Sequence, residues 1–271
     1  FGAGYNSYAP PRVVREFYQT LEGLAEAPRD GFRAVAGPGC LPPDVGMLTG
    51  LPFAEGYDSL NLQEYVDVWR IATRRPLWGN RLKADFLKAA DFESALWPVL
   101  GVGHLVLSAP GRPAQLDVRD LNEPMPRAFV VTRLPSPQHA RVAQMAADPR
   151  EAPADGVALA KLGLVPEAGG LVEDAVVDFL RYEPENIALQ VRAPSPGWLI
   201  LTDSYFPGWQ AYVDGTRRPV LRAYHIFRAV RVDGNAHIQL VYWPISFVLG
   251  FFLCALALGV SAAYLSGRAG R

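Results

Sequence analysis

The longest uncharged stretch of the chain, ISFVLGFFLCALALGVSAAYL, occupies residues 245–265. An α-helix needs about 20 apolar residues to cross the roughly 30 Å of hydrocarbon in a bilayer, so this stretch has the required length. Tyr242, Trp243 and Tyr264 lie at its two ends, and aromatic side chains of this kind gather at membrane interfaces. We therefore expect a transmembrane helix over residues 244–266; a helix buried in a globular core is the alternative.

The charges that flank this stretch bear on its orientation. Arg268 and Arg271 follow it, which favours a short cytoplasmic tail over residues 267–271 by the positive-inside rule. Arg228 and Arg231 precede it and weaken that argument. Because the chain starts without a methionine or a basic-then-apolar signal sequence, we expect it to be the C-terminal part of a longer protein.

Composition narrows the classes of function. The 27 acidic and 26 basic residues nearly cancel, whereas a general nucleic-acid binder would carry a basic surface, so we expect no nucleic-acid partner. A disulfide between Cys40 and Cys254 would join a loop to the middle of the apolar stretch, so none is expected. No cysteine spacing typical of zinc occurs, and the sequence predicts no metal site. The four histidines are scattered along the chain: His104, His139, His225 and His237.

Residues 1–125 predict a mixed α/β subdomain. After two prolines, RVVREFYQTLEGLAEAP carries apolar residues at helical spacing, and GFRAVAG predicts a short strand. A second helix is expected over NLQEYVDVWRIATRR, where Asn61 and Glu64 have the spacing of a capping box. The segment FESALWPVLGVGHLVLS predicts a helix that runs through Pro98 into a strand over residues 104–108.

Residues 126–243 predict antiparallel β-structure. Short β-branched and aromatic runs are bounded by Gly, Pro, Asn or Asp, with one short helix expected over HARVAQMAADP. Asp-Gly pairs at 214–215 and 233–234 are typical of turns in an antiparallel meander or sandwich. The fold class that follows is α+β: a mixed α/β N-terminal subdomain, an antiparallel β-sandwich-like subdomain and one C-terminal transmembrane helix.

The C-terminal half carries a combination of motifs. In GWLILTDSYFPGWQAYVDGTRRPVLRAYHIFRAVRVDGNAHIQLVYWPISFVLGF, a strand ends in Asp before an aromatic-Pro-Gly-Trp, and a Val-Asp-Gly turn follows. An Arg-Ala-Val strand comes next, and Tyr-x-Pro leads into the apolar stretch. Together these elements resemble the C-terminal signature of YfhO-type bacterial membrane proteins. Upstream segments fit as well, and the resemblance covers nearly the whole chain, with its strongest motifs over residues 198–250.

The resemblance implies a membrane glycosyltransferase of the GT-C type, which uses a polyprenyl-phosphate-linked sugar as donor on the outer face of the bacterial cytoplasmic membrane. This chain would then be the soluble extracytoplasmic region and the last membrane helix. Its partners would be the bilayer, the upstream transmembrane helices of the same parent chain, and envelope glycan or lipid-linked sugar. Enzymes of the GT-C type carry their catalytic carboxylate between early membrane helices. No residue of this chain therefore inherits the catalytic role, and no cofactor is expected in it.

One candidate ligand site lies in the long loop before the second expected helix. Asp44, Glu55, Tyr57 and Asp58 would offer carboxylates for sugar hydroxyls and an aromatic face for the C–H surface of a sugar. A loop of this length inside a compact domain is either functional or disordered. A packed linker, with Asp58 or Ser59 near a helix start, is the alternative.

A second candidate site consists of residues in SYFPGWQAYVDGTRRP, together with the Asp that directly precedes this stretch. Within the stretch, one turn precedes a strand and another follows it. Asp203, Trp209 and Asp214 are its candidate ligand-binding residues. The alternatives are that Asp203 bonds to the backbone, that Trp209 anchors the hydrophobic core, and that Asp214 belongs to an Asp-Gly turn. Three cations are candidates for contact with lipid or diphosphate head groups, or form a solvated face: Arg217, Arg218 and Arg222.

Two functions from different classes follow. In the first, the chain is the non-catalytic extracytoplasmic portion of a glycosyltransferase-like polytopic protein, and it positions glycan acceptor or lipid-linked donor. In the second, it is a cell-envelope module that binds glycan or a partner protein, or is structural. A freestanding hydrolase is disfavoured because the chain has no Gly-x-Ser-x-Gly elbow, phosphate loop or paired-acid motif.

Overall fold

The computed structural model describes most of the chain from the first strand to the last helix. The described residues are 32–37, 52–54, 62–75, 93–109, 112–121, 124–136 and 138–269. Their side chains are described too, except at 108, 109, 112–115, 245, 248 and 262–269. The helix expected after the two N-terminal prolines, and the loop residues Asp44, Glu55, Tyr57 and Asp58, lie outside the described residues.

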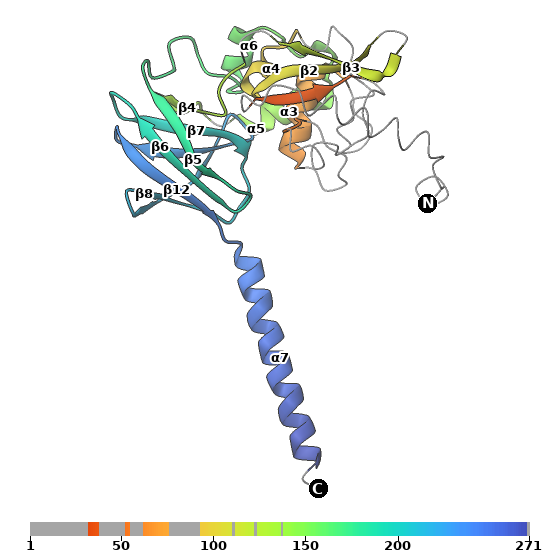
Figure 1. Cartoon of the computed structure of the whole chain (residues 1–271), viewed down its shortest axis with the longest axis vertical. Coiled ribbons are helices and arrows are strands. Elements are labelled where there is room, and N and C mark those ends of the chain that lie inside the picture. Colours follow the sequence, from red (N-terminus) through yellow and green to blue (C-terminus); the bar gives the residue numbers. More distant parts are fainter. Residues whose placement is uncertain are drawn as a thin grey trace.

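Two antiparallel sheets form a sandwich (Figure 1). The four-stranded sheet has the order β10-β11-β7-β4, and the five-stranded sheet has the order β5-β6-β12-β8-β9. The first sheet consists of β4 (Ala128–Val131), β7 (Gly197–Ser204), β10 (Leu221–Ala223) and β11 (Phe227–Val232). The second consists of β5 (Val176–Tyr182), β6 (Asn186–Arg192), β8 (Trp209–Val213), β9 (Thr216–Arg218) and β12 (Ala236–Tyr242).

The sandwich core forms because successive side chains of a strand point to opposite faces. On β6, Ile187, Leu189 and Val191 are buried between the sheets. On β7, Leu199 and Leu201 also point into the sandwich, but Ile200 between them packs into a second core on the other face. The four-stranded sheet is therefore buried on both faces.

Helices and a small sheet contribute the second core, which covers the outer face of the four-stranded sheet. In the small sheet, β1 (Arg33–Ala36) runs parallel to β2 (Val102–Ala109), and β3 (Arg112–Asp120) runs antiparallel to β2. The helical elements are α3 (Gln63–Thr73), α4 (Leu96–Val99), α5 (His139–Ala147), η3 (Pro149–Glu151) and α6 (Gly156–Lys161). Trp69 and Trp97 pack edge to face at the centre of this core, with ring centroids 5.1 Å apart.

The α+β class expected from the sequence is confirmed, since helices and antiparallel sheets both occur. The expected capping box is wrong, because α3 begins at Gln63 with Leu62 as its N-cap residue, and Leu62 makes no side-chain cap hydrogen bond. The Asp-Gly pair at 214–215 turns β8 into β9, with positive φ at both residues. The pair at 233–234 instead carries the chain from one sheet to the other, so the strands form a sandwich rather than a simple meander.

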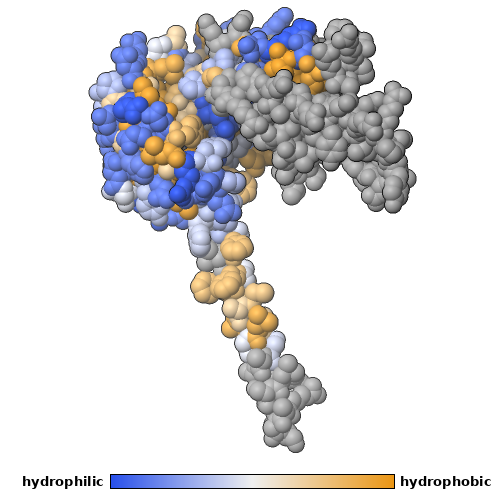
Figure 2. All heavy atoms as spheres, in the orientation of Figure 1, coloured by the Kyte–Doolittle hydropathy of each residue, from blue (hydrophilic) through white to orange (hydrophobic). Residues whose placement is uncertain are grey.

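The last element, α7 (Ile245–Ala269), follows β12 after Trp243 and Pro244 and extends away from the sandwich (Figure 1). Its described side chains are exposed, and many of them are large and apolar, as the orange surface in Figure 2 shows. Over the part of the chain that the structure describes, no helix combines the length and the apolarity of a membrane span.

Candidate functional site

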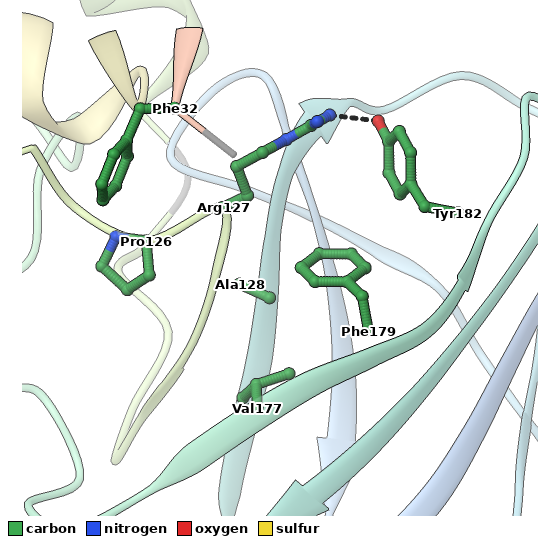
Figure 3. Close-up of a pocket in the computed structure, with 7 residues that line it drawn as sticks. All are labelled: Phe32, Pro126, Arg127, Ala128, Val177, Phe179 and Tyr182. Atoms are coloured by element: carbon green, nitrogen blue, oxygen red, sulfur yellow. Dashed lines mark hydrogen bonds between the residues drawn. The ribbon is translucent and has the colours of Figure 1, made fainter. Parts of the chain in front are cut away.

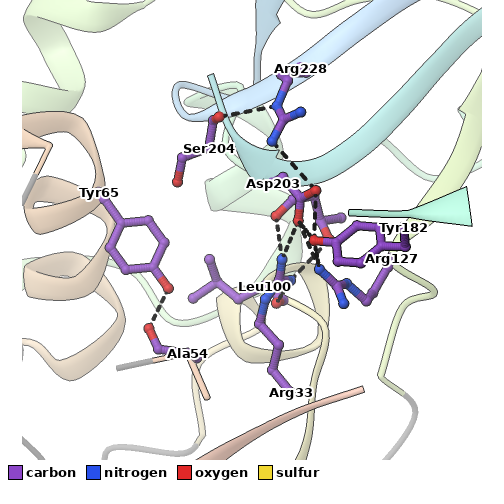
Figure 4. Close-up of polar contacts among 10 residues, drawn as sticks. Arg33, Ala54, Tyr65, Leu100, Arg127, Tyr182, Asp203, Ser204 and Arg228 are labelled. Atoms are coloured by element: carbon purple, nitrogen blue, oxygen red, sulfur yellow. Dashed lines mark hydrogen bonds and ion pairs between the residues drawn. The ribbon is translucent and has the colours of Figure 1, made fainter. Parts of the chain in front are cut away.

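Asp203, near the end of β7, is the centre of a buried polar cluster (Figure 4). Its side chain is only 9% exposed, and three guanidinium groups surround it. Nη2 of Arg33 and Nη2 of Arg127 lie 2.9 and 3.0 Å from Oδ1, and Nη2 of Arg228 lies 3.5 Å from Oδ2. The cluster therefore gathers residues that lie far apart in the sequence around one carboxylate.

Arg33 connects the three-stranded sheet to the sandwich. It begins β1, and its Nη1 donates to the carbonyl oxygen of Leu100 at 2.7 Å and to Oγ1 of Thr202 at 3.0 Å. Its Nη2 donates to the carbonyl oxygen of Thr202 at 2.9 Å as well as to Asp203. These bonds use both ends of the guanidinium fork, so the role of Arg33 is to join the two parts of the fold.

Arg228 is buried on β11 with one nitrogen that lacks a partner. Its Nε donates to the carbonyl oxygen of Ser204 at 3.2 Å, and its guanidinium carbon lies 3.9 Å from the ring centroid of Trp209. The side chain is only 7% exposed, and Nη1 has no hydrogen-bond partner among the described residues. Burying a guanidinium nitrogen without a hydrogen-bond partner is energetically unfavourable.

Tyr182 and Arg127 complete the cluster on its open side. The hydroxyl of Tyr182, at the end of β5, donates to Asp203 at 3.0 Å and accepts a hydrogen bond from Nη2 of Arg127. The guanidinium carbon of Arg127 lies 4.2 Å from the Tyr182 ring centroid, which is the geometry of a cation–π contact. These contacts hold Arg127 in place, just before β4.

The charges of the cluster perturb its ionisable groups. Burial alone would raise the pKa of Asp203, but the positive charges of Arg33, Arg228 and Arg127 outweigh it and hold that pKa below its usual value. Burial and the charge of Asp203 raise the pKa of Tyr182, so its phenol stays protonated and donates a hydrogen bond. Three guanidinium groups share one carboxylate, so two positive charges have no counterpart among the described residues.

A pocket of about 370 Å³ lies beside this cluster (Figure 3). Arg127 and Tyr182 belong to both, and Arg127 extends toward Tyr182 along the rim. The remaining lining is apolar: Phe32, Pro126, Ala128, Val177 and Phe179. The Phe179 and Tyr182 rings lie edge to face with centroids 5.5 Å apart. The pocket thus combines aromatic walls with one cationic edge, which is the usual composition of a small-molecule site.

This arrangement is suited to binding rather than to acid–base chemistry. The carboxylate of Asp203 is ionised, buried and already engaged by cations, so it is a weak base and has little access to a substrate. Among the described residues that line the pocket there is no Ser, Cys, His or Lys that could act as a nucleophile. No group of three or more His, Cys, Asp or Glu within the described ranges could hold a metal ion.

The structure brings two of the candidates from the second site together. Asp203 and Trp209 both contact Arg228, so they belong to one cluster. Asp214 lies elsewhere, in the β8–β9 turn, where its Oδ1 accepts a hydrogen bond from the backbone N–H of His237 at 2.8 Å.

The three candidate head-group cations have separate surroundings. Arg222 forms an ion pair with Glu64 of α3 and lies 5.0 Å from the Tyr205 ring centroid. Arg218 pairs with Asp233 at 3.2 Å, and Arg217 is exposed on β9. They do not converge on the pocket.

Sequence reasoning missed four residues of the cluster: Arg33, Arg127, Tyr182 and Arg228. A signal for two of them was present, because Arg33 in GFRAVAG and Arg228 in IFRAVRV stand inside apolar strand runs. A cation in such a run needs a buried partner. Nothing local indicated the partner, since Arg33 and Asp203 are 170 positions apart.

Histidines form a second polar cluster, between α3, α5 and the β10–β11 loop. Nδ1 of His139 and Nδ1 of His225 lie 3.0 Å apart, and Nε2 of His225 lies 3.7 Å from Oδ2 of Asp67. The fold brings the two histidines together from 86 positions apart, which the scattered spacing did not indicate. Tyr224 and His225 both have positive φ, 47° and 70°, so this loop is strained.

Comparison with known proteins identifies no relative. No family model, curated protein or solved structure matches this chain. What the fold and the site define is an α+β chain with a pocket that is aromatic on its walls and cationic at its edge. Membership of the YfhO-type family stays a prediction from the sequence motifs.

Proposed function

We propose that this chain is the extracytoplasmic portion of a polytopic bacterial membrane protein that resembles polyprenyl-phosphate-sugar-dependent glycosyltransferases. In this proposal α7 crosses the cytoplasmic membrane, and the α+β body stands on the outer side. The body has no catalytic role of its own; it positions a glycan acceptor or a lipid-linked donor for a reaction at upstream helices of the same parent protein.

One observation carries the membrane part of the proposal, namely the exposure of α7. Phe247, Leu256 and Leu258 are 72%, 65% and 69% exposed, and the described residues around them are exposed as well. Contiguous apolar surface of this kind marks an interaction with membrane or protein. At about 1.5 Å per residue, the 25 residues of α7 extend over about 38 Å, which exceeds the roughly 30 Å of hydrocarbon that the proposed crossing would require.

The junction between the sandwich and α7 supports the same proposal. The backbone N–H of Trp243 donates to the carbonyl oxygen of Gly208 at 2.8 Å, which fixes the 206–208 loop against the start of α7. Phe206 and Trp243 are 46% and 56% exposed at this junction. Aromatic side chains in this position suit a membrane interface. A helix in the bilayer would thus hold the sandwich close to the lipid surface.

Glycine is required at position 208 of this junction. Its φ is 114°, and a Cβ there would lie 3.0 Å from the Tyr242 ring and 3.1 Å from Cα of Pro244. Trp209 and Tyr242 pack beside it with ring centroids 5.3 Å apart. The junction is therefore a packed connection, which would transmit the orientation of α7 to the body.

A second candidate function is a non-catalytic envelope module that binds a partner protein. The edge strand β5 favours it, because Val176 and Leu180 are 45% and 58% exposed there. Exposed apolar edge strands are sites of strand pairing with other chains. Sequencing the gene upstream of the codon for Phe1 would separate the two functions: several apolar spans with an acidic outer loop favour the glycosyltransferase, and a lone signal peptide favours the module.

Flotation with lipid vesicles tests the membrane part. We expect the intact chain to float with the vesicles and to resist extraction by high salt. The double variant Leu256→Arg/Leu258→Arg should stay in the aqueous fraction or aggregate, because charges at the centre of a span are costly. The control is Leu221→Arg, an exposed apolar residue on β10. Equal flotation of all three proteins, or none by the intact chain, would overturn the anchor.

A transfer assay tests the non-catalytic part. We expect no turnover of a polyprenyl-phosphate sugar by the purified chain alone, because the described residues offer a binding pocket without acid–base machinery. Sustained turnover by this chain without upstream helices would contradict the proposal.

A further inference from the structure

We infer that the pocket beside Arg127 binds an acidic saccharide, a ligand that carries a carboxylate or phosphate group on a sugar ring. The anionic group would contact Arg127, and the ring would lie against the aromatic walls. This inference rests on the proposed function and specifies which class of glycan the body positions.

The cluster around Asp203 carries excess positive charge. An ion pair of one arginine with Asp203 is neutral overall. Arg33 already forms that pair, in addition to its hydrogen bonds to backbone carbonyl oxygens. Arg127 and Arg228 add two positive charges that no described carboxylate balances. Buried charge without a counterion is strongly unfavourable, so an anion bound nearby would stabilise the cluster. In the partly desolvated site, its attraction to the guanidinium groups would be stronger than in water.

Arg127 lies where it can contact a ligand. Of the three arginines, it is the one that lines the pocket, and its side chain is 15% exposed. Nη2 is occupied by Tyr182 and Asp203, while Nη1 makes no hydrogen bond to a described residue. A carboxylate or phosphate oxygen entering the pocket would accept from this nitrogen. Arg228, by contrast, is fully enclosed beside Trp209 and contributes charge without direct contact.

The walls of the pocket suit the ring of a sugar. Phe179 and Tyr182 present ring surface on one side of the pocket, and Phe32 and Pro126 lie on the other (Figure 3). A sugar ring has an apolar C–H face that packs against aromatic rings, and its hydroxyls can remain in solvent at the open side. The volume of about 370 Å³ is at the lower end of the range for small-molecule sites.

Calorimetric titration of the intact chain in an uncharged detergent tests the inference. The probes are glucuronic acid, glucose 1-phosphate, glucose and inorganic phosphate. We expect at least one of the two charged sugars to bind about tenfold more tightly than glucose and than inorganic phosphate, and the advantage over glucose to shrink at high salt. Which charged sugar binds more tightly distinguishes a carboxylate from a phosphate ligand.

Substitution of Arg127 sharpens the test. Arg127→Gln should abolish the preference for the charged sugar over glucose, a loss of about tenfold in its affinity. Arg181→Gln is the matched control, since it removes the same charge from an exposed position on the same β5 strand that supplies Tyr182. If Arg127→Gln does not fold, Arg127→Lys replaces it in the test. Lysine keeps the positive charge but loses the guanidinium fork, so we expect its affinity for the charged sugar to lie between that of the intact chain and that for glucose.

Several outcomes would overturn the inference. They are equal affinity for glucose and the charged sugars, affinity for inorganic phosphate equal to that for the tighter-binding charged sugar, unchanged selectivity in Arg127→Gln, and no heat from any probe up to about 10 mM. Any of these would leave the flotation result standing. Failure of the ligand class is therefore distinguishable from failure of the membrane-anchored body.

Discussion

Two buried polar clusters lie where the sandwich meets the rest of the fold, and they differ in charge balance and in space. Around Asp203, three guanidinium groups face one carboxylate, beside a pocket of about 370 Å³. Around His225, the carboxylates of Asp67 and Glu64 accompany the cation of Arg222, and the adjoining cavity is only about 10 Å³. The cation of Arg222 offsets one of the two carboxylates, and the space is closed, so we interpret this second cluster as architecture. Unbalanced charge beside an open pocket points to a ligand.

The largest expected effect comes from removing the only described carboxylate of the first cluster. Asp203→Asn leaves the guanidinium groups of Arg33, Arg127 and Arg228 without their counterion, and should lower the free energy of unfolding by about 3–5 kcal/mol. Denaturant unfolding of the intact chain measures it. The control Asp178→Asn removes an exposed ion pair with Arg192 and should cost less than about 1 kcal/mol. Similar losses in both variants would remove the distinction between the buried cluster and the surface.

Acid should act on the second cluster first. Burial lowers the pKa of His225, and His139 lowers it further, while Asp67 and Glu64 oppose the shift. The unfolded chain therefore binds a proton more readily than the folded one, so stability is complete above about pH 6.5 and falls as the pH drops below it. Unfolding curves across pH 7 to 5 measure the slope.

Two variants isolate His225 as the source of that slope. Asparagine tolerates the positive φ of 70° at this position, so His225→Asn should fold and should flatten the pH dependence. His237→Asn changes an exposed histidine on β12 and should leave the slope intact. A slope that survives in His225→Asn would assign the titration to another group.

The depressed pKa of Asp203 predicts a different pH range for the first cluster. Its carboxylate is more acidic in the folded chain, so its contribution is complete above about pH 4 and is lost only as the pH falls further. The Asp203→Asn variant should therefore show the same stability deficit at pH 7 and at pH 5. A deficit that disappears by pH 5 would contradict the low pKa.

The smallest expected effect on stability belongs to Arg228→Met. Methionine keeps packing against Trp209 and removes a buried guanidinium that has an unpartnered nitrogen, so gains and losses should nearly cancel, within about 1 kcal/mol. Affinity for a charged sugar should fall as well, but less than in Arg127→Gln, because Arg228 does not line the pocket. A loss of several kcal/mol in denaturant unfolding would show that Arg228 is a required structural partner of Asp203.

The sequence predicted the parts of the fold that depend on local pattern. The alternation of Ile187, Leu189 and Val191 predicts β6, and Asp214-Gly215 predicts a turn with positive φ. The sequence did not predict which of several neighbouring residues is the N-cap of α3. Asn61 and Glu64 have capping-box spacing, but Leu62 is the N-cap residue. Strand β3 was not expected, because its sequence RPAQLDVRD starts with Arg-Pro and lacks a regular alternation.

The candidate site was only partly predictable for a physical reason. Asp203 and Trp209 stood out because they lie near the end of one expected strand and at the start of the next, on either side of a turn. Their partners Arg33, Arg127 and Arg228 come from three separate strands or strand ends, and only the pairing of sheets brings them together. The net charge of a buried cluster depends on which distant residues the fold brings together. No local sequence pattern could therefore reveal the two unbalanced positive charges around Asp203.

A structure of the intact chain with the tighter-binding of glucuronic acid and glucose 1-phosphate is the most direct test of the difference between the two clusters. We predict the anionic group of that sugar within hydrogen-bond distance of Arg127 and the sugar ring against Phe179, with His225 and its neighbours unchanged. A sugar bound at the His225 cluster, or an empty pocket beside Arg127 at saturating ligand, would contradict the assignment of the site.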